Sequence, residues 1–368
     1  MRRFAYKKYL LVGTLLFILL TLPTAYVEHL RGGTVCLLSF LLKGGKLFAK
    51  SKVNPEERLE AENHLLRLEL GKLRALLEQK GKVEALLEET GRYTLSAKRL
   101  EETRYLTSLS SQAVAARVIY RDAASWSNSF WVNVGEETNH VLNRRAIQKN
   151  CPVIVGRSVV GALDYVGKKQ SRVRLITDPA LKPAVRAVRG LPQNVLLLEH
   201  VEPLLRHLYA KNLPMSDEKA TLLKSLAKWK EQLSVDTEGW YLAKGILEGG
   251  KRPRCRSIHH TLSGVGFNYD FADEEGPARE LASGKPFDDV DQVKALPIIL
   301  VNDLLVTTGM DGVFPPGLRV AEVTKVYPLR EGAYTYEIEA TPVVGNLDTL
   351  QTVFIISPLG YEDEDRQS

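Results

Sequence analysis

The feature that most constrains this chain is an uncharged stretch close to its N-terminus. Residues 9–27 read YLLVGTLLFILLTLPTAYV, which is 19 residues without a charge. An α-helix of that length extends about 28 Å, which is close to the hydrocarbon thickness of a bilayer. A cleaved signal peptide is the alternative, but Pro23 disfavours cleavage after Ala25 and the apolar run is longer than a usual signal core. We therefore predict an uncleaved transmembrane helix over 9–27.

The charges on either side of this segment predict its orientation. Arg2, Arg3, Lys7 and Lys8 precede it, whereas Arg31 is the one basic residue among the next fifteen. Positively charged flanks stay in the cytoplasm. The prediction is a single-pass protein with a short cytoplasmic tail, residues 1–8, and with nearly all of the remaining chain exported.

A helix suited to pairing is predicted after a juxtamembrane segment, residues 28–55. From Glu56 the composition shifts to Glu, Leu, Lys and Arg. Leucines recur there at alternating steps of four and three, which gives a narrow stripe suited to one partner helix. The predicted pairing positions are Leu59, Asn63, Leu66, Leu70, Leu73, Leu77 and Leu87. We predict a coiled-coil helix over 56–109 with Asn63 fixing its register; a solvated or intramolecular helix is the alternative.

From Ala113 the chain changes to short β-type runs separated by Gly, Pro, Asn and Asp. The predicted strands are 114–120, 129–134, 153–155, 159–166, 171–177, 318–326, 334–340 and 351–356. Their spacing is typical of barrels or sandwiches and leaves no room for βαβ crossovers. The intervening chain predicts helices at 195–212 and 216–234, a strand at 265–271 and a long loop at 272–296.

These elements predict a mainly β fold. It consists of two small β-barrel-like domains, preceded by a transmembrane helix and a coiled-coil helix and containing a partly helical insertion. The predicted regions are a first β region at 113–190, the insertion at 191–296, a second β region at 297–357 and an acidic tail at 358–368. Within the second predicted helix, one face is interpreted as core, with a partner site as the alternative. That face is formed by Leu222, Leu223, Leu226, Trp229 and Leu233.

Composition narrows the class of protein further. A hydrophobic fraction of 44% with 26% charged residues excludes wholesale disorder. The net charge of +6 does not require nucleic acid, because four basic residues lie in the N-terminal tail. Three cysteines, Cys36, Cys151 and Cys255, exclude a disulfide framework and a four-cysteine zinc site. Cys151 and Cys255 either pair or remain two small apolar residues.

Catalytic patterns are missing or incomplete in the sequence. There is no Gly-Asp-Ser-Gly context and no G-x-S-x-G elbow. Ser216–Lys219 fits the S-x-x-K pattern but lacks its companion motifs, and Ser216 is interpreted as a helix cap. Cys255, His259 and His260 lie on a basic loop, which is a poor place for a cation. We predict no catalytic, metal-binding or cofactor-binding residues and no cofactor.

Short motifs recur in order through the two β regions. They are Ala116–Ile119, Arg121–Asp122, Ser125–Asn128, Pro152–Ile154, Val160–Gly161, Ser171–Val173, Leu175–Pro179, Asp303–Gly309 and Val313–Leu318. In this order, behind an anchor and a coiled coil, they resemble the rod shape-determining protein MreC family. The motif residues of greatest interest are Trp126, Ser127, Asn128, Thr177, Asp178, Pro179, Thr308, Gly309, Phe314, Pro315, Pro316 and Gly317. We predict that Trp126 packs under a strand and that Pro315–Leu318 forms a turn before one.

The sequence also departs from the family pattern. Asn302 stands where the family usually has Gly, which predicts a different turn, and the connection between the two matched regions is longer than usual. Gly245–Gly249 is similar to a family strand, which would divide the extra chain into two insertions. The resemblance covers residues 1–190 and 297–357.

The resemblance implies a bacterial inner-membrane scaffold of the cell-elongation machinery, with its N-terminus in the cytoplasm and its bulk in the periplasm. Such a scaffold organises peptidoglycan synthesis and cell shape. It implies as partners a penicillin-binding transpeptidase, MreB, MreD and RodA, together with a homodimer or higher self-assembly, and it implies neither an enzyme nor a nucleic-acid-binding protein. The alternatives are a membrane-tethered periplasmic hydrolase or peptidase with a degenerate site, and an adaptor of a secretion system.

Overall fold

The computed structural model describes the chain from residue 104 to residue 358, with gaps. The described ranges are 104–106, 108–110, 112–122, 126–142, 144–210, 217–235, 239–250, 261–287 and 295–358. The predicted transmembrane helix and the coiled-coil pairing positions lie outside these ranges. No helix within the described ranges is both long enough and apolar enough to span a bilayer.

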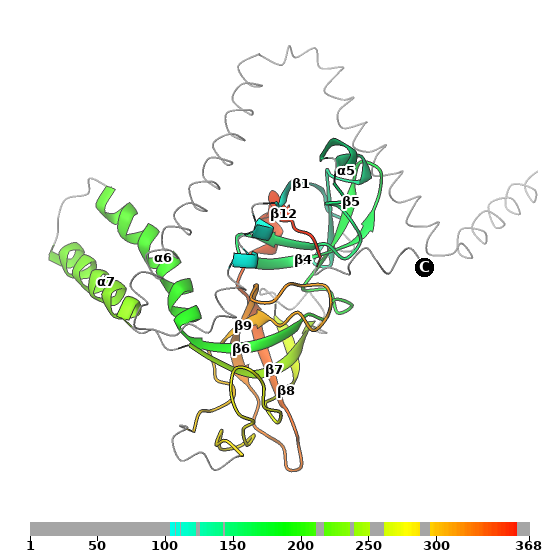
Figure 1. Ribbon diagram of the computed structural model, residues 1–368. Helices are drawn as coiled ribbons and strands as arrows, with labels where there is room; N and C mark the ends of the chain where they lie inside the picture. The colour runs from blue at the N-terminus through cyan, green and yellow to red at the C-terminus, as the bar shows by residue number, and fades with distance from the viewer. Residues whose placement is uncertain are drawn as a thin grey trace, which may run out of the picture.

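The described residues form twelve strands that close into two barrels, drawn one above the other in Figure 1. Six antiparallel strands in the order β1–β2–β5–β4–β3–β12 close the first barrel. These are β1 (Val114–Tyr120), β2 (Ser129–Val132), β3 (Pro152–Val155), β4 (Ser158–Val166), β5 (Ser171–Leu175) and β12 (Thr352–Ile355). Closure leaves no free sheet edge in this barrel.

The second barrel also has six antiparallel strands, in the order β6–β7–β8–β11–β10–β9. They are β6 (Ala184–Gly190), β7 (Gly239–Gly249), β8 (Leu262–Asn268), β9 (Leu304–Thr307), β10 (Arg319–Val326) and β11 (Tyr336–Pro342). One parallel bridge, between Arg319 of β10 and Ser158 of β4, links the two barrels. The prediction of a mainly β fold with barrel-like domains is therefore confirmed for the described residues.

Helices occupy the connections between strands. A short helix α5 (Glu136–Leu142) follows β2, and a 3-10 turn η4 (Leu347–Thr349) precedes β12. Two longer helices, α6 (Leu191–Ala210) and α7 (Asp217–Val235), form a hairpin between β6 and β7 that projects away from the barrels in Figure 1. Helices at 195–212 and 216–234 are thus confirmed, within a few residues at their ends.

The barrels are assembled from strands that lie far apart in the chain. β12 belongs to the predicted second β region but closes the first barrel, whereas β6 belongs to the predicted first β region but lies in the second barrel. β7 and β8 come from the predicted insertion and are integral strands of the second barrel. The α6–α7 hairpin is the described part of residues 191–296 that is helical and lies outside the barrels. Strand partners separated by a hundred residues or more leave no signal in local periodicity.

Core side chains fill both barrels as one continuous cluster. In β5 the burial alternates strictly, as expected of a strand with one face inward. The largest fully buried side chains include Phe130, Leu163 and Leu175 in the first barrel and Leu247, Leu262 and Phe267 in the second. Burying a side chain of this size contributes about 1.5–3 kcal/mol to stability.

Candidate interaction surfaces

The turn that leaves β5 carries three of the predicted motif residues and contacts the second barrel. Thr177, Asp178 and Pro179 form this turn, and Gly249 at the end of β7 lies against it. A Cβ atom built on Gly249 would be 2.1 Å from the Thr177 carbonyl oxygen. The Leu247 amide donates to the Pro183 carbonyl at 3.1 Å, beside this contact. The motif therefore forms part of a close junction between the barrels.

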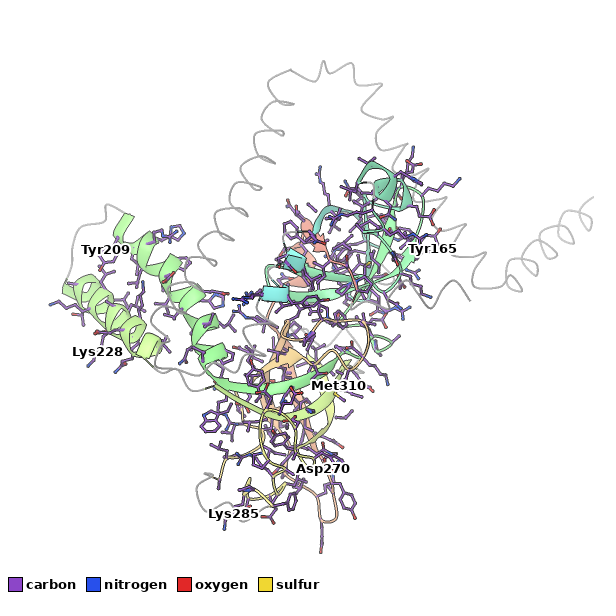
Figure 2. The ribbon with its side chains drawn as sticks, in the orientation of Figure 1. Tyr165, Tyr209, Lys228, Asp270, Lys285 and Met310 are labelled. Atoms are coloured by element: carbon purple, nitrogen blue, oxygen red, sulfur yellow. The ribbon has the colours of Figure 1, made fainter. Side chains whose placement is uncertain are left out.

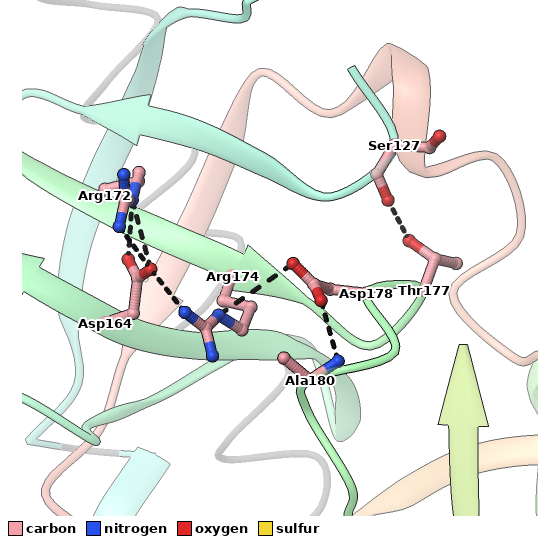
Figure 3. A network of polar contacts seen from close by, with 7 residues as sticks. All are labelled: Ser127, Asp164, Arg172, Arg174, Thr177, Asp178 and Ala180. Carbon is pink, nitrogen blue, oxygen red and sulfur yellow. Dashed lines mark hydrogen bonds and ion pairs between the residues drawn. The ribbon is translucent and has the colours of Figure 1, made fainter. Parts of the chain in front are cut away.

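A polar network holds this turn from the first barrel, as Figure 3 shows. The Thr177 hydroxyl donates to the Ser127 carbonyl, and the Asp178 carboxylate accepts from the Ala180 amide at 2.8 Å. Arg174 lies 3.9 Å from Asp178 and also donates to Asp164 at 3.2 Å. Three motif residues, Ser127, Thr177 and Asp178, thus act together in fixing the turn.

The Asp164 carboxylate joins this network to the next strand. Arg172 donates to both carboxylate oxygens of Asp164, with its shortest distance 2.7 Å (Figure 3). Both side chains of this pair are largely buried. A carboxylate shared by two guanidinium groups orients β4 and β5 relative to each other.

The second motif cluster surrounds the turn between β9 and β10. The Thr307 hydroxyl donates to the Pro315 carbonyl at 2.5 Å and accepts from the Leu318 amide at 2.9 Å. Gly309 and Gly317 adopt positive φ angles of 82° and 85°, a conformation that glycine enters without steric strain. The predicted turn before a strand is confirmed, because β10 begins directly after it.

Asp311 organises the same turn from within. Its carboxylate accepts from the Val313 and Phe314 amides at 2.9 Å and from the Ala184 amide of β6 at 3.0 Å. Phe314 is buried, and the Thr308 amide donates to the Ala184 carbonyl at 3.1 Å. The shape of this turn therefore depends on hydrogen bonds between side chains and the backbone, and its motif residues hold this end of the second barrel together.

Trp126 does not pack under a strand, so that prediction is wrong. Its side chain is 44% exposed, and the Arg121 guanidinium lies 5.5 Å from the ring centroid. Arg121 lies closer to the Phe130 ring, at 4.9 Å, and donates to the Leu347 carbonyl. The guanidinium separates Trp126 from the core, so the indole covers the arginine at the surface instead of filling the barrel.

The second barrel contains two carboxylates held by arginine. Arg189 donates to both oxygens of Asp303, at 2.8 and 2.7 Å, and the Leu300 amide donates to the same carboxylate at 2.7 Å. The Asp303 side chain is 2% exposed. This buried pair connects β6 to the turn that enters β9.

The other carboxylate is Asp273, which follows β8. Arg186 and Lys244 lie 2.9 and 2.7 Å from its Oδ2, and the Tyr269 hydroxyl donates to Oδ1 at 2.9 Å. Burial alone would raise the pKa of Asp273, but hydrogen bonds from Lys244 and the charge of Arg186 outweigh it and hold that pKa well below its usual range. The carboxylate is therefore ionised at neutral pH and anchors the chain after β8 to β6 and β7.

An open apolar groove of ≈ 420 Å³ lies on the second barrel. Two chain segments line it, at 297–301 and 326–329, together with Tyr336. Its aromatic rings are fixed, because the Tyr327 hydroxyl donates to Glu339 at 2.6 Å and the Tyr336 hydroxyl to the Leu281 carbonyl at 3.3 Å. Lys325 lies 4.3 Å from the Tyr327 ring centroid. A preformed apolar groove with charged side chains beside it suits an apolar protein segment.

Asn302 directly follows Val301 of this groove and adopts a left-handed conformation, with φ of 72°. Asparagine tolerates that conformation better than other non-glycine residues. Gly would adopt the same backbone conformation without strain. That this turn differs from the family pattern stays a prediction.

The contacts between the helical hairpin and the barrels include an apolar cluster, an ion pair, and a hydrogen bond from the Gln193 side chain to the Asn302 carbonyl at 2.5 Å. Leu196 of α6 packs against Val188, Leu304 and Val306 on the second barrel. Arg319 donates to both oxygens of Glu199 on α6, at 2.5 and 3.0 Å. The N-terminal half of α6 is thereby held near the bridge between the barrels.

The face of α7 that was interpreted as core is only partly buried. Leu223 is buried, whereas Leu222 and Trp229 of the same face are 49% and 62% exposed. The interpretation of this face as core is therefore wrong in part.

The catalytic and metal-binding candidates of the sequence lie largely outside the described residues. Cys151 is a buried free thiol, and burial raises its pKa to about 11, which keeps it protonated at neutral pH. Ser216, Cys255, His259 and His260 lie outside the described residues. Within the described ranges, no group of three or more His, Cys, Asp or Glu side chains is placed to hold a metal ion.

Comparison with known proteins identifies the class of this two-barrel fold. Residues 118–234 and 254–357 match the family model described as rod shape-determining protein MreC, barrel core. The match covers more than half of the chain and includes strands of both barrels. This chain belongs to the rod shape-determining protein MreC family, and the resemblance seen in its motifs is confirmed.

The solved structures to which this chain is similar include three from named bacteria. MreC from Pseudomonas aeruginosa is 16% identical, with a TM-score of 0.36, over 66% of this chain and 98% of that one. MreC from Listeria monocytogenes is 14% identical, with a TM-score of 0.40, over 77% and 97%. A complex between a penicillin-binding protein and MreC from Helicobacter pylori is 10% identical, with a TM-score of 0.32, over 67% and 97%. No curated protein sequence matches this chain.

Sequence reasoning missed the groove and the buried ion pairs of the second barrel. Arg189 and Asp303 are 114 residues apart, and the groove joins segments on either side of β9 and β10. Val301 and Tyr327, which line the groove, belong to none of the motifs found in the sequence. One signal was present: Asp303 opens a motif of the sequence, and its ion pair with Arg189 accounts for a carboxylate at this buried position.

Proposed function

We propose that this protein is a membrane-anchored, non-enzymatic scaffold of bacterial cell elongation, which organises peptidoglycan synthesis by binding a penicillin-binding transpeptidase and a second copy of itself. The observation that carries this proposal is the family match across both barrels. A family member has been solved in complex with a penicillin-binding protein, which supports the choice of partner class. MreB, MreD and RodA are the further partners in this proposal.

The mechanism is geometric. A helix over 9–27 anchors the chain in the inner membrane with its N-terminus in the cytoplasm, and the bulk of the chain lies in the periplasm. Confinement to the membrane raises the effective concentration of any bound enzyme. The helix over 56–109 pairs two copies and sets the distance of the barrels from the bilayer. The buried junction at Gly249 and Thr177 supports this role, because it joins the two barrels closely.

We place the transpeptidase contact at the apolar groove of the second barrel. Val301 is 50% exposed on this groove and Leu300 is 42% exposed. Substitution Val301→Lys is expected to weaken binding of the purified transpeptidase by at least about tenfold, because a lysine ammonium would have to be desolvated in an apolar contact. Titration calorimetry with the full-length protein in detergent measures this change.

Val265→Lys is the matched control for the groove variant. Val265 lies on β8 of the same barrel, is 40% exposed and does not line the groove. Its substitution is expected to leave the transpeptidase affinity within about twofold of the parent. Equal losses in the two variants, or none in either, would place the contact elsewhere.

The predicted coiled coil has its own test. Leu66→Pro combined with Leu73→Pro should abolish coiled-coil pairing, because each proline costs about 3 kcal/mol in a helix interior. Crosslinking of the full-length protein in membranes measures the pairing, with Leu59→Met and Leu87→Met as a control that retains apolar side chains. Unchanged crosslinking in the proline variant would show that 56–109 does not pair.

A further inference from the structure

One end of the first barrel is formed where β1, β3 and β5 begin and where β2, β4 and β12 end. The antiparallel registers require this arrangement, since Val166 of β4 pairs with Ser171 of β5, and Ile355 of β12 pairs with Val114 of β1. The bridge to the second barrel is at Ser158, where β4 begins. That bridge is therefore at the opposite end of β4.

Five basic side chains gather at this end, in the two connections that cross it. The α5–β3 connection carries Arg144, Arg145 and Lys149, the β4–β5 turn carries Lys168 and Lys169, and all five side chains are exposed. The two connections touch each other, because the Glu136 and Glu137 amides at the start of α5 donate to the Gly167 and Lys168 carbonyls at 2.9 Å. We call this set of five basic side chains the basic end.

The basic end carries more positive charge than its own connections neutralise. From β2 to β3 and from β4 to β5, Glu136 and Glu137 are the acidic residues of the sequence, against five basic ones. The Glu137 carboxylate lies 3.9 Å from the Lys169 ammonium, and both side chains are more than half exposed. Like charges held this close repel one another, so an anionic occupant would stabilise this end.

The chain leaves the described part of the structure beside the basic end. After β12, the Ile356 amide donates to the Pro152 carbonyl at 3.1 Å, at the start of β3. Lys149 is three residues before Pro152 in the sequence. Arg144 donates to the Gln112 carbonyl at 2.5 Å, two residues before β1 begins. The chain beyond Ile356 therefore starts between the two basic residues Lys149 and Arg144.

Four consecutive acidic residues follow a short distance further on. Residues 362–365 read EDED, and the first of them is four residues beyond Pro358. Because an extended chain spans at most about 3.6 Å per residue, four residues reach about 14 Å and seven reach about 25 Å. The helix α5, which separates the two groups of basic residues, is about 10 Å long. The acidic segment 362–365 can therefore reach both groups.

We propose that the acidic segment 362–365 binds the basic end of its own chain. Four carboxylates then face an excess of three basic side chains, which nearly neutralises this end of the barrel. Single ion pairs between exposed groups are weak, so the contact depends on several charges and on the short tether. A short flexible tether holds the segment at an effective concentration of about millimolar, which free anions would have to exceed. The contact involves one barrel of one chain and does not depend on the proposed scaffold function.

Carbodiimide coupling of the full-length protein in detergent tests this contact, because the reagent joins a carboxylate to a lysine amine without a spacer. We expect the segment 362–365 to couple to Lys149, Lys168 or Lys169. The coupled fraction should fall by at least about fivefold between about 0.01 M and 1 M salt, since the Debye length decreases from about 30 Å to 3 Å. Peptide mapping by mass spectrometry measures the coupled fraction for each lysine.

The matched control lysines are Lys228 of α7 and Lys285 of the chain that follows β8. Both are exposed. Figure 2 shows them well apart from Tyr165, which lies next to the end of β4 and marks the basic end. We expect little coupling of the acidic segment to either control.

A variant without the four carboxylates gives a second readout. It combines Glu362→Gln, Asp363→Asn, Glu364→Gln and Asp365→Asn. Acetylation of Lys149 is expected to become about threefold faster in this variant, because the segment no longer covers the basic end, while acetylation of Lys285 stays unchanged. Equal rates for Lys149 in the variant and the parent would overturn the proposal.

Three coupling results would also overturn it. One is coupling of the acidic segment to Lys228 or Lys285 as often as to the basic end. Another is coupling that combines heavy and light peptides in a mixture of isotope-labelled and unlabelled protein, which would assign the occupant to a second copy. The third is coupling of the basic end to Glu101 or Glu102 in place of the acidic segment, which would assign this surface to the chain that precedes the first barrel.

Discussion

Gly249→Ala is expected to lower the free energy of unfolding by about 3 kcal/mol or more, and to disturb the contact between the two barrels. The new Cβ would lie 2.1 Å from the Thr177 oxygen and 2.4 Å from its carbonyl carbon. Both obstacles are backbone atoms, so no side chain can rotate away to make room. The turn that carries Thr177, Asp178 and Pro179 would have to move, and with it the network around Asp164. Denaturant unfolding of the full-length protein in detergent, followed by tryptophan fluorescence, measures the loss.

Gly345→Ala separates this steric effect from an ordinary loss of glycine. Gly345 has φ of 76° and no atom within 4 Å of the position that a Cβ would take. Its substitution should cost about 1–2 kcal/mol from backbone strain alone. A Gly249 variant no less stable than the Gly345 variant would contradict a close junction between the barrels.

Asp303→Ala is expected to destabilise the protein by about 3–5 kcal/mol, because it leaves a largely buried guanidinium without its carboxylate. Asp303 holds two nitrogens of Arg189 and the Leu300 amide, and its side chain is 2% exposed. The loss should appear in the same unfolding measurement. Adding Arg189→Met to Asp303→Ala should restore part of the stability, since the uncompensated charge is then removed.

Lys182→Ala is the matched control for this ion pair. Lys182 lies 2.7 Å from Glu248, but its side chain is 54% exposed. Removing an exposed partner should change stability by no more than about 1 kcal/mol. If Asp303→Ala and Lys182→Ala lower the free energy of unfolding by the same amount, burial does not make the Asp303–Arg189 pair more important for stability than an exposed ion pair.

The sequence predicted the strands of the first barrel more completely than those of the second. The run at 114–120 is rich in β-branched residues and forms β1 over the same seven residues. By contrast, β6 contains Arg186 and Arg189, which local patterning assigns to solvent. Both arginines are held by carboxylates 87 and 114 residues later in the chain, so their burial has no local signal.

The same reason explains which candidate residues were predicted well. The turn at 315–318 was predicted, because Pro and Gly specify turns locally. The turn at 177–179 was not, and the strand predicted over 171–177 ends at Leu175. The environment of Trp126 was not predictable, because it depends on Arg121, which binds the Leu347 carbonyl 226 residues away. Likewise, the exposure of Trp229 depends on how α7 packs against α6, which a one-helix pattern does not show.

The most direct test of the scaffold function is co-purification of the full-length protein from bacterial membranes after mild crosslinking, with unbiased identification of every protein captured. We expect a penicillin-binding transpeptidase to be enriched together with a second copy of this chain, and the Val301→Lys variant to lose the transpeptidase alone. Capture of secretion components in place of the transpeptidase, or stoichiometric labelling of the purified protein by a serine-reactive probe, would contradict it.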